Sequence, residues 1–147
     1  MIKNILLSID FDDNEQKLLD TAKQMGLAFN AKVWLIHIAA PDPDFVGYDV
    51  GPQYIRDQRA EDLREEHKKL QNYADNLNVS GVDSDGLLVQ GATTDMILKE
   101  AKQLNIDLMI LGHNKRNYLY DIFVGSVSED VIKESKIPVL VVPMNVE

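Results

Sequence analysis

The stretch that decides the fold is GLLVQGATTDMILKEAKQLNIDLMILG, residues 86–112. It begins and ends with short apolar runs, at 86–90 and 107–112, in which Leu, Ile and Val follow one another without polar alternation. Continuous runs of this kind are typical of strands buried on both faces of a parallel sheet. The segment between them, 94–104, has helical periodicity. A strand, a helix and a second strand in this order predict a right-handed crossover between parallel strands.

Outside this unit the same alternation continues in both directions along the chain. Further apolar runs predict strands at 4–9, 32–38 and 138–142. Segments with helical periodicity lie at 13–28, 54–77 and 127–135. This order predicts an α/β fold, with one open, doubly wound, five-stranded parallel sheet and helices on both faces. A chain of 147 residues can build one sizeable core, so we expect 1–147 to be a single domain.

The helix starts carry recognisable capping signals. Thr93 or Thr94 is the expected N-cap of helix 94–104, because a threonine hydroxyl can accept a bond from the free amides of the first turn. Asp13 with Gln16 fits a capping box for helix 13–28. Ser126 with Glu129 fits another for helix 127–135.

Two helices have apolar faces that are expected to pack against the sheet. In 94–104 the face consists of Ile97, Leu98, Ala101 and Leu104. In the highly charged segment 54–77, Leu63, Leu70 and Leu77 recur seven residues apart. A heptad can indicate a coiled coil, but three leucines in one helix more often form a core-facing stripe.

The composition excludes several classes of function. The chain has 15 Lys and Arg against 24 Asp and Glu, a formal net charge of −9, which disfavours nucleic acid as a partner. It has no cysteine, so disulfides and thiolate metal sites are ruled out. The first apolar run is too short for a signal peptide, and no run has the roughly 18 apolar residues of a membrane span. A cytoplasmic protein that does not insert into membranes is expected.

A glycine-bounded loop is the candidate ligand site. It runs from Gly112, at the end of a predicted strand, to Gly125, before a predicted helix, and contains Lys115 and Arg116. The N-terminus of a helix offers free amides and a favourable dipole to an anion, and the two cations could add charge-assisted bonds. The loop therefore suits phosphate. The two glycines could equally serve only as turn residues, and neither a Walker loop nor a Gly-x-Gly-x-x-Gly motif is present.

The histidines and the first acidic cluster have simpler interpretations. His37, in an apolar strand, is expected to be half-buried with its polar atoms satisfied, and His67 to be solvated on a charged helix. His113, beside the loop, could contact phosphate or lie on the surface. Scattered histidines do not predict a metal site. The acidic side chains of Asp12, Asp13 and Glu15 are interpreted as complementing a helix dipole.

These sequences resemble the universal stress protein family over essentially the full length. ILLSIDFDDNEQKLLDTA is similar to that family's opening strand and helix, and VWLIHI to its second strand. The resemblance is specific over 86–143, where the crossover unit is followed by VGSVSEDVIKESKIPVLVVP. The nucleotide-binding branch of the family carries glycine, two residues, glycine, nine residues, then glycine with serine or threonine. Gly112 and the pair Gly125 and Ser126 match this spacing, and Lys115 replaces the middle glycine.

The resemblance implies an adenine-nucleotide site for ATP or AMP, with or without magnesium. Adenine and ribose are expected to contact the ends of the first two strands. Phosphates are expected on the glycine loop and the following helix start. The implied residues are Ser8, Asp10, Ile38, Leu111, Gly112, Lys115, Gly125, Ser126, Val127 and Ser128.

Lys115 leaves the function open between two classes of protein. A lysine in a left-handed backbone costs about 1–2 kcal/mol, whereas a charge-assisted bond to phosphate contributes about 1.5–3 kcal/mol. The preferred hypothesis is a non-catalytic, nucleotide-binding regulatory protein of the universal stress type. The alternative is an interaction module of the same type that has lost nucleotide binding because of Lys115. A slow ATPase or phosphotransferase is a third hypothesis, weakened because no general base is evident beside the loop.

The last strand is the candidate interface. The segment IPVLVVP, 137–143, is almost wholly apolar and is flanked by Pro138 and Pro143, as an edge strand is. An uncovered edge of this kind would aggregate. The resemblance implies a homodimer in which this strand pairs with its copy in a partner.

Overall fold

The strands and helices expected from the sequence are all present. The computed structural model describes residues 1–11, 14–40, 53–113 and 127–144. Along the chain its elements are β1 (Asn4–Ser8), α1 (Glu15–Phe29), β2 (Lys32–Ala39), α2 (Gln53–Val79), β3 (Ser84–Gln90), α3 (Thr93–Gln103), β4 (Leu108–His113), α5 (Val127–Glu134) and β5 (Val139–Pro143).

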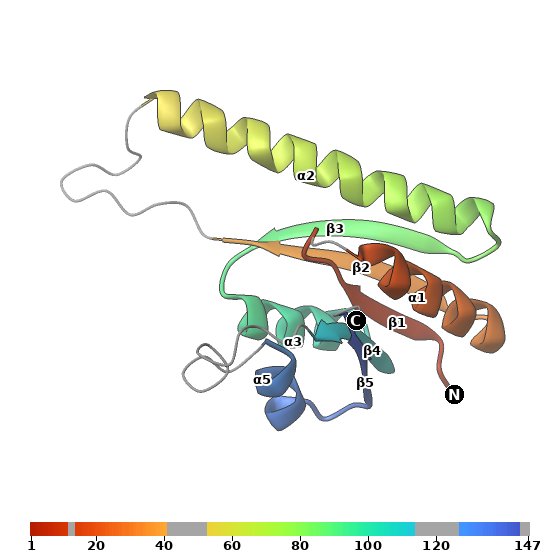
Figure 1. Ribbon diagram of the computed structural model, residues 1–147. Coiled ribbons are helices and arrows are strands. Elements are labelled where there is room, and N and C mark those ends of the chain that lie inside the picture. The colour runs from red at the N-terminus through yellow and green to blue at the C-terminus, as the bar shows by residue number, and fades with distance from the viewer. Residues whose placement is uncertain (12–13, 41–52, 114–126, 145–147) are drawn as a thin grey trace.

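The strands form one parallel sheet in the order β3-β2-β1-β4-β5 (Figure 1). The central strand β1 pairs with β2 on one side and with β4 on the other, so that Ile5 lies opposite both Val33 and Leu108. From β1 the chain builds the sheet outward through β2 and β3, and then returns to the other side of β1 with β4 and β5. The doubly wound sheet is confirmed, and the strand order reverses between β1 and β4.

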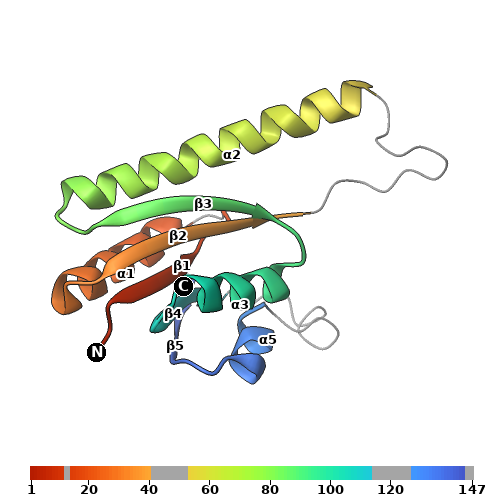
Figure 2. The same cartoon turned by 180° about the vertical axis from the view of Figure 1, so that it is seen from behind.

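Helices cover both faces of the sheet, as expected (Figures 1 and 2). Helices α1 and α2 pack on one face, where Leu19 and Leu70 join Ile5 and Leu7 in a buried cluster. Helices α3 and α5 pack on the other face, in a second cluster built around Leu6 of the same strand. Alternate residues of β1 therefore point into opposite halves of the core, as the period of a strand requires.

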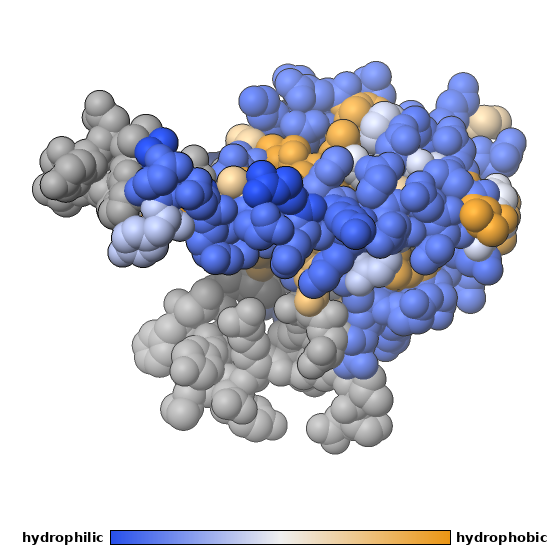
Figure 3. All heavy atoms as spheres, turned by 90° about the horizontal axis from the view of Figure 1, so that it is seen from above, coloured by the Kyte–Doolittle hydropathy of each residue, from blue (hydrophilic) through white to orange (hydrophobic). Residues whose placement is uncertain are grey.

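Helix α2 is much longer than the sheet it covers. Its buried residues, Leu70, Ala74 and Leu77, all lie in its second half, and Leu63 is half-buried. The leucine stripe is thus a core-facing stripe, as predicted. The outward face of the helix is hydrophilic (Figure 3), and its N-terminal turns extend beyond β3 (Figure 1).

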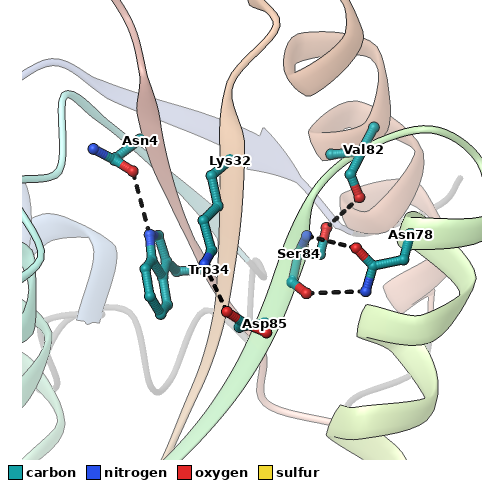
Figure 4. A network of polar contacts seen from close by, with 7 residues as sticks. All are labelled: Asn4, Lys32, Trp34, Asn78, Val82, Ser84 and Asp85. Carbon is teal, nitrogen blue, oxygen red and sulfur yellow. Dashed lines mark hydrogen bonds and ion pairs between the residues drawn. The ribbon is translucent and has the colours of Figure 1, made fainter.

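A set of polar contacts fixes the start of β3 relative to α2 and β2 (Figure 4). The side-chain oxygen of Asn78 accepts the Ser84 amide at 2.8 Å, and its Nδ2 donates to the Ser84 carbonyl at 3.0 Å. On the neighbouring strand, Lys32 Nζ lies 2.6 Å from Asp85 Oδ2 and 4.0 Å from the centre of the Trp34 ring. These contacts set the register at the end of the sheet opposite the candidate site.

Two of the predicted helix caps are wrong. Helix α3 begins at Thr93 and its N-cap is Ala92, which has no side chain to cap with. Helix α1 begins at Glu15 after Asn14, whose left-handed backbone (φ 68°) makes no side-chain cap bond. Gln16 donates to Asp20 at 2.9 Å instead of bonding back to a capping residue. Asp13 and Ser126 lie outside the described residues, so the box at Ser126 and Glu129 stays a prediction.

None of the helices within the described ranges is long and apolar enough to cross a membrane.

Candidate functional site

The site expected from this topology lies beyond the carboxyl ends of β1 and β4. Ligands of open α/β sheets bind where the strand order reverses, because neighbouring connections there leave to opposite faces. The carboxyl ends of β1 and β2 and the starts of α3 and α5 lie at the same end of the molecule (Figures 1 and 2).

The β1 side of this site contains Ser8 and Asp10. Ser8 ends the strand and is buried, whereas Asp10 is exposed two residues later. Between them, Ile9 is fully buried and its amide donates to the Ile36 carbonyl at 2.9 Å. The backbone that leads to Asp10 is therefore tied to β2, and the carboxylate of Asp10 follows a rigid strand end.

The end of β2 contains Ile38 and His37. Ile38 packs in the core, and the ring nitrogens of His37 make polar contacts. Ile38 is buried in the cluster between the sheet and α3. His37 is also buried, and its Nδ1 lies 2.6 Å from the carbonyl of Ile9. A carbonyl can only accept, so Nδ1 carries a proton. Nε2 lies 3.3 Å from Glu66 Oε2 on α2, an ion-pair distance. The expectation that His37 has satisfied polar atoms is confirmed, but the side chain is buried rather than half-buried.

The β4 side brings Gly112 and His113 close to the first turn of α5. His113 Nδ1 lies 3.0 Å from the hydroxyl oxygen of the buried Ser128. Leu111 is buried, and Val127, the first residue of α5, is exposed. The end of β4 and the start of α5 are thus in contact, and the phosphate contacts of these residues stay a prediction.

Gly112 also has a packing reason to be glycine. A Cβ at this position would lie 2.9 Å from Met144 Cγ and 3.2 Å from Leu18 Cδ1. The residue is in β4 and pairs with Val142 of β5, so it does not form a separate turn after the strand. The glycine is explained by close contact between α1 and the segment after β5, and this explanation is independent of any ligand.

The remaining predicted contacts, Lys115, Gly125 and Ser126, lie outside the described residues, as does Arg116. Their roles stay predictions from the sequence. His67, predicted to be solvated, is exposed on α2. The described ranges contain no group of three or more His, Cys, Asp or Glu side chains arranged to hold a metal ion.

Glu15 is the residue that the sequence interpretation underestimated. It lies in the first turn of α1, as expected for an acid that complements the helix dipole, but it is buried. Its Oε1 accepts the amides of Asp10 at 3.2 Å and of Phe11 at 2.9 Å. Its Oε2 accepts the hydroxyl of Tyr73 at 3.0 Å. The carboxylate therefore folds back onto the turn that carries Asp10.

Burial changes the acid–base properties of this pair. It raises the pKa of the Glu15 carboxyl above its ordinary value, against the opposing effect of the bonds from Phe11, Tyr73 and Asp10. Burial also raises the pKa of the Tyr73 hydroxyl, and the adjacent Glu15 charge raises it further. The core-facing position of Tyr73 could have been predicted from the sequence, because Tyr73 lies between Leu70 and Leu77 on the apolar side of a predicted helix. Its contact with Glu15 could not, since 58 residues separate the two.

Known proteins share this fold and much of this sequence. The model of the universal stress protein family matches residues 1–143. A universal stress protein of Thermus aquaticus, from the 3′ region of the QAH/OAS sulfhydrylase gene, is 32% identical over 145 residues, which cover 97% of this chain and 99% of that protein.

Solved structures agree with this assignment. The structure of MJ0577 has a TM-score of 0.79 at 26% identity and covers 100% of this chain and 99% of its own. MJ0577 is a universal stress protein of Methanocaldococcus jannaschii. A universal stress protein crystallised in complex with cAMP has a TM-score of 0.70 at 23% identity over 98% of both chains, a likeness that shows the shared fold.

Proposed function

Because this chain belongs to the universal stress protein family, we propose that it binds an adenine nucleotide, ATP or AMP, beyond the carboxyl ends of β1 and β4. Adenine and ribose contact the β1 and β2 ends through Ser8, Asp10 and Ile38. The phosphates lie on the segment from Gly112 to the first turn of α5, with Lys115 as a cation beside them.

The observation that carries the proposal is the contact between the end of β4 and the start of α5. His113 and Ser128 meet there at 3.0 Å, next to the end of β1 that leads to Asp10. The first amides of a helix have no partners within the helix, and its dipole favours a negative charge at that end. A phosphate chain at α5 and a ribose at Asp10 would both be within reach of one nucleotide. A protein with this fold was crystallised with cAMP, which makes adenine nucleotides the first ligands to test.

We infer a regulatory role without catalysis, in the cytoplasm. The names of curated relatives describe universal stress and stress-response proteins. In the proposed role, nucleotide occupancy changes the shape of the site and is read by a partner, so the nucleotide need not be consumed. Magnesium would enter with the phosphates of ATP and would not be needed for AMP.

The protein is also proposed to be a homodimer through 137–143. β5 is an edge strand of the sheet, and Val139, Leu140 and Val141 are only half-buried in the single chain. A two-fold axis beside this strand would bring the same residues of two copies together and cover the edge.

The decisive experiment is acid extraction of the freshly purified protein followed by chromatography, combined with thermal unfolding in the presence of ATP or AMP. A ligand at a hundredfold excess over its Kd stabilises the protein by about 2.7 kcal/mol, which is readily seen as a rise in Tm. Gly125→Val is expected to abolish this rise, because a branched side chain would occupy the space of the phosphate oxygens.

The outcomes separate the hypotheses. No extracted nucleotide, and no shift with either ligand with or without magnesium, would favour the interaction module that has lost nucleotide binding. Binding of ATP followed by steady release of ADP would replace the regulatory role with slow hydrolysis. A shift that Gly125→Val leaves unchanged would move the phosphates away from this loop.

A further inference from the structure

The turn between β1 and α1 holds an unusual backbone. Phe11 has φ 61° and Asn14 has φ 68°, both in the left-handed region. For a bulky aromatic residue such as Phe11 this conformation is strained, and it persists only where surrounding contacts over-determine it. Asp10, the proposed ribose contact, immediately precedes this strained residue.

The contacts that hold the turn come from α1, α2 and β2. Glu15 Oε1 accepts both the Asp10 and the Phe11 amide, at 3.2 and 2.9 Å. Tyr73 of α2 donates to the other oxygen of Glu15 at 3.0 Å, which fixes the direction of the carboxylate. The centre of the Phe11 ring lies 4.6 Å from that of His37 and 6.2 Å from that of Tyr73. One face of α2 therefore supports the turn through both polar and aromatic contacts.

We propose that Glu15 and Tyr73 form a positioning pair that presets Asp10 for the ribose of the bound nucleotide. This inference rests on the proposed nucleotide-binding function. Ile9 fixes the backbone on one side of Asp10 through its bond to β2, and Glu15 fixes it on the other side. A free turn would lose backbone conformational entropy when a ligand binds to Asp10, whereas a turn held by these bonds has lost it during folding. The pair therefore raises affinity without touching the ligand.

A purely stabilising role fits the burial of Glu15 less well. Moving a carboxylate out of water is unfavourable, and for Glu15 burial is the largest influence on its pKa, which is raised. An apolar side chain of the same length could fill this space without that penalty. What an apolar side chain could not supply is an acceptor for two successive amides, which is the feature that shapes the turn.

Two substitutions at one position separate hydrogen bonding from packing. Glu15→Met keeps the length of the side chain and removes both acceptors. Glu15→Gln keeps an acceptor for the two amides and can donate its own N–H to the oxygen of Tyr73. Isothermal calorimetry with ATP should show affinity lowered about tenfold for Glu15→Met and within about twofold of wild type for Glu15→Gln, as expected for loss or retention of a bond to a charged acceptor. Tyr73→Phe should lower ATP affinity about threefold, because the Glu15 carboxylate keeps its bonds to the two amides but loses the hydroxyl contact that fixes its direction.

The matched control is Asp20→Asn. Asp20 lies on the same helix, is exposed, and accepts a bond from the neighbouring Gln16. Its replacement should leave ATP affinity at the wild-type value. Amide hydrogen exchange in the ligand-free protein supplies a second readout, in which Asp10 and Phe11 should be protected in wild type and Glu15→Gln and exchange faster in Glu15→Met.

Each result bears on a different claim. If wild type binds ATP and Glu15→Met binds equally well, the positioning role is refuted and the nucleotide site stands. If Glu15→Met and Glu15→Gln lose affinity equally, the amide bonds are not the cause, which also refutes it. If wild type binds no nucleotide, the proposed function fails and the positioning role fails with it. Should Glu15→Met not fold, unchanged affinity in Tyr73→Phe together with unprotected Asp10 and Phe11 amides in wild type would still overturn the inference.

Discussion

Single residues show most directly how closely the site is joined to the core. Gly112 belongs to the proposed phosphate surface, yet its missing side chain leaves room for Met144 and Leu18 on the buried side of the sheet. The same backbone thus belongs to the proposed phosphate surface and also packs closely against α1 and the segment after β5. For substitutions in this part of the molecule, the free energy of unfolding should therefore be measured before any change in ligand affinity is interpreted.

We expect Gly112→Ala to lower the free energy of unfolding by about 1–2 kcal/mol, because the added methyl overlaps Met144 and overpacks the contact. Met144 is a flexible side chain, so Met144→Ala in the same chain should recover part of this loss. Urea unfolding of the two single variants and the double variant measures the coupling. Additive effects would show that the methyl does not meet Met144.

The pH dependence of stability should reveal the buried carboxyl of Glu15. Its pKa in the folded protein is raised above the ordinary value of 4.5, chiefly by burial. As pH rises past 4.5 the unfolded chain loses this proton first, so stability falls until the folded protein has also lost it. Glu15→Gln removes that fall. The difference in unfolding free energy between Glu15→Gln and wild type should therefore grow with pH through this window and then level off, whereas a constant difference would contradict a raised pKa.

At the scale of elements, the central strand is tied at both ends. Beyond its carboxyl end Glu15 accepts the Asp10 and Phe11 amides. At its start, Asp107 accepts the Lys3 amide at 2.8 Å and the Asn4 amide at 3.0 Å, immediately before β4 begins. The bonds from these two amides lower the pKa of the Asp107 carboxyl. The two acids hold opposite ends of β1, and their pKa values shift in opposite directions, because burial dominates at Glu15 and the bonds from the two amides dominate at Asp107.

Asp107→Ala should lower the free energy of unfolding at neutral pH by about 1 kcal/mol, the usual scale for exposed bonds of this kind. Because the folded pKa lies below the ordinary value of 3.8, this stabilisation is present above pH 3.8 and is lost as pH falls through the folded pKa. Asp107→Asn keeps a neutral acceptor and should lose less, without the acid dependence. Urea unfolding at pH 7 and near pH 3 tests both, and an equal deficit at the two pH values would exclude the charge as its source.

At the scale of the whole molecule, two buried clusters share one strand. Leu6 packs with α3 and α5, and its neighbours Ile5 and Leu7 pack with α1 and α2. If the strands separate, the apolar side chains of both clusters become exposed to water. This arrangement explains how one sheet holds the two helix layers together in one domain.

We expect the chain to unfold as one domain for this reason. Trp34 is the only tryptophan and packs against the cluster that contains Leu6, so its fluorescence reports that face of the sheet. Far-UV circular dichroism reports all helices, including α2 on the other face. The two signals should give the same denaturant midpoint. Two separate midpoints would mean that the faces unfold independently.

Two variants test the dimer interface proposed at 137–143. Wild type should sediment as a dimer at tens of micromolar. Val141→Lys should shift it toward monomer, because a lysine would be placed in the self-complementary edge contact. Val79→Lys is the matched control, since Val79 is 90% exposed at the end of α2, the helix that packs against β3 at the opposite edge of the sheet. A monomeric wild type would refute the dimer, and a dimeric Val141→Lys of unchanged stability would place the interface elsewhere.

The sequence by itself determined the class and order of the elements. Runs such as 86–90 and 107–112 became strands, and Leu70 and Leu77 became the buried stripe of α2, because burial imposes a periodicity that a short window of sequence displays. The edge position of 137–143 was predicted from the flanking Pro138 and Pro143, and the doubly wound sheet from the alternation of strands and helices. These features depend on local pattern and on rules of connection that apply to all such chains.

Only the tertiary structure decided what the turns and polar residues do. The caps at Ala92 and Asn14 differ from the predicted ones, because a cap depends on the backbone angles of the incoming loop as well as on residue type. Glu15 looked like an ordinary first-turn acid until folding brought Tyr73 to it from a distant helix. Contacts between residues so far apart in the sequence depend on how the helices pack on the sheet, and a local sequence pattern does not predict them. The packing that buries Glu15 also directs its carboxylate to the turn that carries Asp10.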